Sequence, residues 1–402
     1  MESPAATRGW DIAARPDAVP EGSIVVHIGP PKTATTQVQA ALYAARPVLR
    51  AHGVRHAGAN RHPAGSVSAV LGRRSGFAGD VVPPITRWTN LVSAIHRAAE
   101  PRVIVSSEFF ADATPEDVRR VVDDLGPDRV RVVITLRPLA RILPSQWMQY
   151  VCDGSGIPWD KWLRAMLEPQ VGQKKVTPSF WRRHRHHELV KRWATVVGAD
   201  RVTVLAIREG DRGGVLRDFE SLLGLRAGLL HEQESNGNRS LTWPEAEAVR
   251  EFNRRVRADG LSRVDLQRVM HYGASRYIKD LPADPAAPRI ELPDWVLPHV
   301  RREAAANVER IPALGVEVAG DLPGLGAVPE PTGLPTPTPD GSPVVAATLG
   351  VGVLIATGMA RPGPAESRED MAMVATYALR GYIARRVMKS IRRRLGRIRR
   401  GW

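Results

Sequence analysis

The chain has almost no cysteine: Cys152 is the only one among 402 residues. A single cysteine excludes an internal disulfide, so nothing in the sequence asks for an oxidising compartment. The first 22 residues contain no apolar core of the kind that a secretory signal has. We expect residues 1–20 to form a poorly ordered arm and the protein to be cytoplasmic.

Long apolar runs are also scarce. Val344–Ala360 is apolar, but it contains glycine and threonine and is shorter than the about 20 strongly apolar residues that a membrane-spanning helix needs. We therefore expect a soluble or interfacial helix there. The sequence contains no internal repeat.

Positive charge is abundant but unevenly spread. The net charge is +15, and the segment 380–402 holds ten Arg and Lys and no acid. The basicity therefore belongs mainly to a tail and does not predict a nucleic-acid-binding fold. In this tail, apolar residues recur every three or four positions, at Ile383, Val387, Ile391, Leu395, Ile398 and Trp402. Such a basic amphipathic helix suits peripheral contact with an anionic inner-membrane surface; packing on the catalytic domain or on a partner is an equal alternative.

Short β-branched runs predict four buried strands, at Ser23–Ile28, Arg102–Ser106, Arg129–Leu136 and Arg201–Ile207. Helical patterns lie between them, and 46–88, which is rich in Gly, His, Arg and Pro, predicts irregular structure. Strands that alternate with helices imply βαβ units. We expect an α/β fold of three layers, α/β/α, with a mostly parallel central sheet.

The expected organisation has four parts. After the arm, an α/β domain covers 21–322, a Pro/Gly-rich linker covers 323–343, and a helical extension with the basic tail covers 344–402.

The loop after the first strand has the composition of an anion site. Gly29-Pro30-Pro31 ends the strand, and Lys32, Thr33, Thr35 and Thr36 precede or open a helix. The free N–H groups and the dipole of a helix N-terminus favour a bound anion, and the lysine adds positive charge. The alternative is an ordinary strand-to-helix turn with a surface lysine.

The order of these residues differs from a Walker A loop, in which the lysine comes late, directly before the helix. The run Pro31-Lys32-Thr33-Ala34-Thr35-Thr36 resembles the 5'-phosphosulfate loop of sulfotransferases that use 3'-phosphoadenylyl sulfate (PAPS). Members of that family commonly read P-K-[ST]-G-[ST]-[ST], with glycine at the position of Ala34. Because alanine resists a positive φ, we expect Ala34 to be helical.

A second pair of residues supports the same resemblance. Arg137 follows the third predicted strand, and Ser145 lies eight positions later. Sulfotransferases have this spacing in their 3'-phosphate motif, and a guanidinium and a hydroxyl can hold one phosphate together. The late Arg-Lys-Gly run of the family is absent, and Arg239 is a candidate substitute. A surface arginine after a strand is the alternative for Arg137.

The resemblance implies a role for each of these residues. Pro31, Lys32, Thr33, Ala34, Thr35 and Thr36 hold the 5'-phosphosulfate; Arg137, Ser145 and Arg239 hold the 3'-phosphate; and Lys32 neutralises the leaving group without a metal. Lys32, Glu108 and Arg137 each follow a strand, so we expect them to converge at one sheet edge.

The acceptor hydroxyl or amine also needs a base. Glu108 is the first candidate, and His56 and His62 are weaker ones. The cluster of His184, His186 and His187 predicts a solvated basic face or contacts to an acidic acceptor.

Two other functions remain open. One is an ATP-dependent P-loop phosphotransferase, because Lys32-Thr33 partly matches a Walker lysine. The other is a non-catalytic adaptor that binds a membrane through the tail. For the sulfotransferase, the acceptor class stays open among small molecules, glycans and lipids, and so does the oligomeric state.

Overall fold

The computed structural model describes residues 14–74, 81–168, 179–211, 213–233, 239–258, 260, 266–267, 269–333 and 343–356. The chain divides into two compact units, each assembled from several segments. The first unit takes residues 1–143, 175–234 and 294–331, and the second takes 144–174, 235–293 and 332–402. The segment expected to be one domain, 21–322, therefore contributes to both units.

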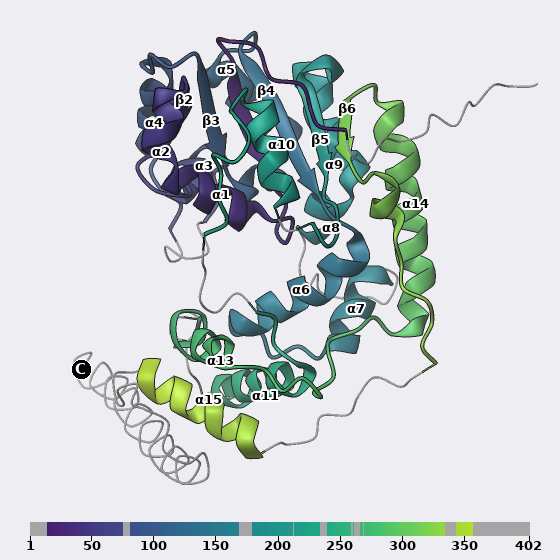
Figure 1. The fold of residues 1–402 in the computed structure, drawn as a ribbon. Helices are drawn as coiled ribbons and strands as arrows, with labels where there is room; N and C mark the ends of the chain where they lie inside the picture. Colours follow the sequence, from purple (N-terminus) through teal and green to yellow (C-terminus); the bar gives the residue numbers. More distant parts are fainter. Residues whose placement is uncertain are drawn as a thin grey trace, which may run out of the picture. The chain divides into compact units, whose positions relative to one another are not determined.

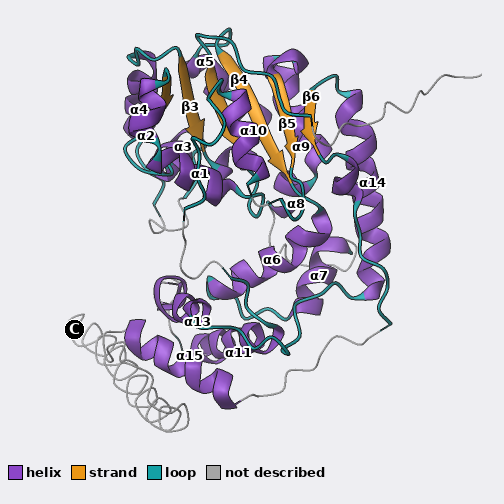
Figure 2. Ribbon diagram, in the orientation of Figure 1, coloured by secondary structure: helices purple, strands orange, loops and turns teal. Residues whose placement is uncertain are grey.

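The first unit is built on a six-stranded parallel sheet (Figure 1 and Figure 2). Its strands are β1 (Ile24–Ile28), β2 (Val54–His56), β3 (Arg102–Ser106), β4 (Val130–Leu136), β5 (Val202–Ala206) and β6 (Glu317–Gly320). They are ordered β2-β3-β1-β4-β5-β6, and every neighbouring pair is parallel. The expected α/β fold with a parallel central sheet is confirmed.

The helices of this unit are α1 (Thr35–Ala44), α2 (Arg46–Ala51), α3 (Ala64–Val70), α4 (Thr86–His96), α5 (Pro115–Leu125), α8 (Phe180–His184), α9 (His186–Val197), α10 (Gly214–Leu222) and α14 (Leu297–Ala313). Short 3₁₀ turns include η1 (Glu108–Asp112). Helix α5 begins with a capping box, in which Thr114 and Asp117 bond each other's backbone N–H and Pro115 takes the first helical position.

Strand alternation divides the core between the two faces of the sheet. Ile24, Val26 and Ile28 of β1 pack with α3, α4, α5, α9 and the end of α14. Val25 points to the other face, which α1, α2 and α10 cover (Figure 1). Both faces are thus buried, which explains why the central strands are apolar throughout.

The four predicted strands are confirmed as β1, β3, β4 and β5, within a residue or so at each end. Two strands were not predicted: β2, with the sequence VRH, and β6, with EVAG. Both lie at sheet edges, are very short and carry polar residues, so they lack the apolar run of a central strand. The prediction of irregular structure over 46–88 is wrong, because α2, β2, α3 and the start of α4 lie there.

The second unit is helical. Its elements are the part of α6 (Leu139–Cys152) from Pro144 onward, α7 (Trp159–Leu167), α11 (Trp243–Ala258), the π-turn η3 (Met270–Ala274), α13 (Ser275–Asp280) and α15 (Pro343–Ala356). Tryptophans fill its centre: the ring of Trp147 lies 5.3 Å from Trp159 and 6.0 Å from Trp243, and Trp159 stacks on Trp162 at 5.7 Å. Burial of such large rings supplies much of the unit's stability.

The segment expected to be a linker begins inside the first unit. Pro323–Gly326 forms a 3₁₀ turn (η5), and Leu325 is buried in the core. Helix α15 packs against η3, α11 and α13 of the second unit. The basic amphipathic tail lies outside the described residues. Among the residues that are described, no helix is long and apolar enough to cross a membrane.

Candidate functional site

The predicted site residues of the first unit follow three neighbouring strands. In the sheet, β1 lies between β3 and β4. Glu108 follows β3, Lys32 follows β1 and Arg137 follows β4. Parallel sheets bind ligands at the carboxyl ends of their strands, where neighbouring crossovers leave in opposite directions. The topology therefore gathers these side chains at one edge, as expected.

The loop between β1 and α1 has an unusual backbone. Lys32 has φ 74° and Ala34 has φ 60°, and these are the only positive φ values of non-glycine residues among those described. The expectation that Ala34 is helical is wrong: it takes the left-handed conformation, which a glycine would adopt without steric cost. A left-handed alanine costs about 1–2 kcal/mol. Strain of this kind is concentrated at functional sites.

A chain of buried side chains holds this loop to the sheet. His27 Nδ1 lies 2.8 Å from Ser106 Oγ, and its Nε2 lies 3.3 Å from Thr135 Oγ1. Thr135 Oγ1 lies 3.1 Å from Thr33 Oγ1, which donates to the carbonyl of Pro30 at 2.7 Å.

The hydrogen bond from Thr33 to the Pro30 carbonyl determines which atom is the donor in each of the other bonds. Because the Thr33 proton goes to Pro30, Thr135 donates to Thr33, the Nε2–H of His27 donates to Thr135, and Ser106 donates to Nδ1. Burial lowers the pKa of His27 to about 3, so the ring is neutral, as this arrangement requires. His27, Ser106 and Thr135 were not predicted; a histidine in an apolar strand was the one available signal.

The threonines of the loop have different roles. Thr35 is buried and donates to the carbonyl of Gly29 at 2.9 Å. With the Thr33 bond, two of the three hydroxyls stabilise the loop itself. Thr36 is exposed in the first turn of α1, which contains no acidic residue. The helix N-terminus and the half-buried Pro31 and Lys32 thus form a surface with the charge that an anion needs.

Glu108 interacts electrostatically with this loop, because the charge of Lys32 acts on its pKa. It opens η1, directly after the capping residue Ser107, and is half-buried. Burial raises the pKa of Glu108 above its ordinary value, and the charges of Lys32, Arg183 and Arg61 act in the opposite direction. A raised pKa makes the Glu108 carboxylate a stronger base than an ordinary glutamate, which is what a general base needs.

The two weaker base candidates lie in different places. The Nε2 atom of His62 is 2.8 Å from Ser107 Oγ, and its ring packs on Phe109 at 5.1 Å, so His62 is next to Glu108 in space. Burial, helped by the charge of Arg61, lowers the pKa of His62 to about 4. His56, by contrast, lines a pocket beside β2.

Arg137 is engaged by a residue that sequence reasoning missed. Its guanidinium donates two hydrogen bonds to Glu209, at 2.6 and 3.1 Å. The bond from Arg137 lowers the pKa of Glu209, which stays ionised. Glu209 follows β5, the neighbour of β4. No local signal marked it, because 72 residues separate the partners.

Ser145 and Arg239 belong to the second unit. Ser145 lies on α6 and is half-buried, and its pairing with Arg137 stays a prediction. Arg239 forms two bonds to Glu245, each 2.8 Å, and donates to the carbonyls of Ser240, Ile278 and Leu281. Its guanidinium donors are thus used within the unit. These bonds hold Arg239 within the second unit, and its contact with a phosphate stays a prediction.

The prediction of a solvated face at His184, His186 and His187 is wrong, because all three side chains are buried. His187 bonds Asn307 through Nδ1 at 2.9 Å, and burial lowers the pKa of His186 to about 3. The neighbouring arginines suggested a wet surface, but the helical packing of α8 and α9 turns the imidazoles inward. Among the described residues, no group of three His, Cys, Asp or Glu is arranged to hold a metal ion.

Comparisons with known proteins add little to this geometry. No protein-family model matches the chain, and no curated protein matches it. A sulfotransferase from Alicyclobacillus acidocaldarius is similar in structure, with a TM-score of 0.39 and 19% sequence identity over 62% of this chain and 95% of that one.

Proposed function

We propose that this protein is a sulfotransferase that moves a sulfuryl group from PAPS to a hydroxyl or amine of a glycan, lipid or small-molecule acceptor. One observation carries the proposal. It is the loop after β1, in which Lys32 and Ala34 take left-handed conformations directly before a helix that has no acid in its first turn. The charge of Lys32 in this loop also acts on the pKa of Glu108.

The residues of the loop fit the donor that the resemblance implies. The sulfuryl group itself is supplied by PAPS. Lys32 and the first N–H groups of α1 bind and neutralise the 5'-phosphate, and the exposed Thr36 adds a hydroxyl. Glu108 takes the proton of the acceptor, and its raised pKa brings its basicity closer to neutral pH. Arg137 contributes to 3'-phosphate binding after it exchanges Glu209 for the ligand.

Calorimetric titration with adenosine 3',5'-bisphosphate, and separately with ATP and Mg²⁺-ATP, tests this function. We expect the bisphosphate to bind the wild-type protein and Lys32→Ala to weaken it by about 100-fold, because one charged contact is lost in a partly enclosed site. Lys191→Ala, at an exposed lysine of α9, is the matched control and should bind as the wild type does. A preference for Mg²⁺-ATP would contradict the proposal and favour the phosphotransferase alternative.

A further inference from the structure

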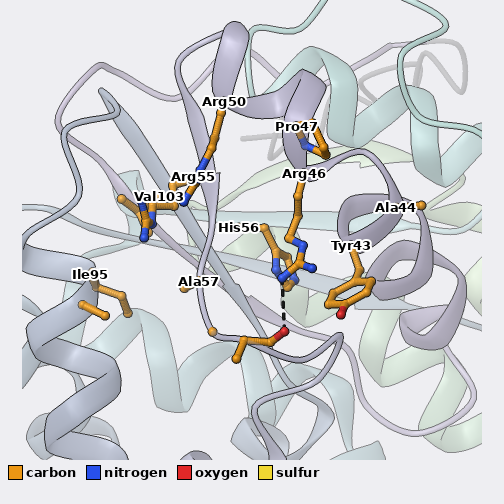
Figure 3. A pocket seen from close by; sticks show the side chains of 13 residues that line it. Tyr43, Ala44, Arg46, Pro47, Arg50, Arg55, His56, Ala57, Ile95 and Val103 are labelled. Carbon is orange, nitrogen blue, oxygen red and sulfur yellow. Dashed lines mark hydrogen bonds between the residues drawn. The ribbon is translucent and has the colours of Figure 1, made fainter.

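A pocket of about 820 Å³ lies at the β2 edge of the first unit, separate from the loop after β1. The end of α1, helix α2, strand β2 and helix α4 form its walls (Figure 3). Its volume is in the range of small-molecule sites. The apolar part of the lining includes Tyr43, Pro47, Ala94 and Ile95.

His56 is the first sign of a ligand in this pocket. The side chain is 6% exposed, and neither ring nitrogen has a hydrogen-bond partner among the described residues. Burial, with the charge of Arg46, lowers the pKa of His56 to about 4, so the ring is neutral at pH 7. A neutral imidazole has one donor and one acceptor, and leaving both unmet costs about 1–3 kcal/mol each. A bound anionic group would accept a hydrogen bond from the N–H of the ring.

Arginines give the pocket its charge. Arg46 lies over the Tyr43 ring, 3.7 Å from its centroid, and one N–H donates to the carbonyl of Ala59 at 3.1 Å. Figure 3 shows its guanidinium beside the His56 ring. Arg50 and Arg55 share one carboxylate, Glu100, at 3.4 Å each. The three arginines, Arg46, Arg50 and Arg55, are thus matched by the single carboxylate of Glu100, and the net charge around the pocket is positive.

We propose that this pocket binds an organic anion with a single acidic head and a small apolar body. Arg46 pairs with the head, the N–H of the neutral His56 ring donates a further hydrogen bond to it, and the Tyr43–Pro47 wall covers the apolar part. The arginines provide charge-assisted hydrogen bonds, and the apolar lining excludes water from them. This site does not depend on the sulfuryl-transfer proposal, because none of its lining residues belongs to the loop after β1.

Titration calorimetry with naphthalene-2-sulfonate, compared with the neutral naphthalene-2-carboxamide, tests the proposal. We expect the sulfonate to bind at least tenfold more tightly than the amide. Arg46→Gln should weaken the sulfonate about tenfold, and Arg120→Gln, at an exposed arginine of α5, should not. Lys32→Ala should keep the wild-type affinity, and adenosine 3',5'-bisphosphate should not displace the sulfonate.

His56→Phe separates a binding role from a structural one. The phenyl ring removes two unpartnered nitrogens, so the melting temperature should stay the same or rise while the affinity for the sulfonate falls about tenfold. Equal binding of sulfonate and amide, unchanged affinity in Arg46→Gln, loss of binding in Lys32→Ala, or no binding up to about 5 mM would each overturn the proposal.

Discussion

The loop after β1 and the arginine after β4 follow adjacent strands of the sheet, but they are prepared for an anion in different ways. In the loop, the hydroxyls of Thr33 and Thr35 donate to backbone carbonyls of the loop itself. Arg137, by contrast, already donates two hydrogen bonds to the carboxylate of Glu209. The loop therefore has its shape before any ligand arrives, whereas an anion could bind Arg137 only by displacing Glu209.

The largest effect should come from the base next to the loop. Glu108→Gln should lower kcat about 1,000-fold, because the amide cannot accept the acceptor's proton. In the wild type, kcat/KM should fall as the pH drops through the pKa of Glu108, and burial places this fall above the range of an ordinary glutamate. Steady-state rates between pH 5 and 9 measure both effects.

Glu116→Gln is the control for this prediction, because Glu116 is an exposed acid on α5 with 74% side-chain exposure. Its kcat and pH profile should match the wild type. If Glu108→Gln retained wild-type activity, the base would be elsewhere, and His62, bonded to Ser107, would be the next residue to replace.

The preformed loop should also be sensitive to added volume. A Cβ on Gly29 would collide with Thr35 Oγ1 and approach Thr135 Oγ1 to 2.9 Å. Both oxygens belong to the bonds that shape the loop, so Gly29→Ala should lower the free energy of unfolding by about 3 kcal/mol. Urea denaturation measures this change.

Gly213→Ala serves as its control, because there the Cβ would meet only the flexible end of Arg217. That variant should change stability by less than about 1 kcal/mol. If Gly29→Ala were as stable as the wild type, the bonds of Thr35 and Thr135 would not fix the shape of the loop, and the contrast with Arg137 would be wrong.

A smaller effect tests the strain at Ala34. Ala34→Gly should raise the free energy of unfolding by about 0.5–1 kcal/mol, since relief of the left-handed alanine exceeds the added entropy of the unfolded chain. Ala40→Gly, inside α1, should do the opposite and cost about 1 kcal/mol. Thermal and urea unfolding of both variants decide the sign, and a loss of stability in Ala34→Gly would contradict the strained geometry.

The sequence predicted those parts of the fold and site that depend on neighbours in the chain. The apolar runs of β1, β3, β4 and β5 each contain enough β-branched residues to be recognised alone, whereas β2 and β6 become strands only by pairing at the edges of the sheet. The position of Lys32 next to Glu108 followed from strand order. The second unit was not predicted, because its helices come from segments separated by parts of the sheet.

The same distinction explains the arginines. The position of the loop between β1 and α1 follows from residues close in the chain, so the sequence located it, although it did not predict the left-handed conformation of Ala34. The availability of an arginine depends on carboxylates that the fold brings near it, and sequence order does not show them. Glu209 for Arg137 and Glu245 for Arg239 are such partners. The buried histidines of α8 and α9 were misjudged for a related reason, since the charge of neighbours in sequence does not set the direction of a side chain.

The smallest effect tests directly whether Glu209 competes with a ligand for Arg137. Glu209→Gln removes the competing carboxylate, and the ion pair is partly exposed, with side-chain exposures of 31% and 34%. Pairs of this kind are worth about 0.2–1 kcal/mol, so the affinity for adenosine 3',5'-bisphosphate should rise only about two- to fivefold, as measured by calorimetry. The double variant Arg137→Gln/Glu209→Gln should lose this gain, because the carboxylate matters only while the arginine is present. If Glu209→Gln instead weakened the binding of the bisphosphate, Glu209 would hold Arg137 in position for the ligand. The contrast between a loop that is formed before binding and an arginine that is occupied by a carboxylate would then be wrong.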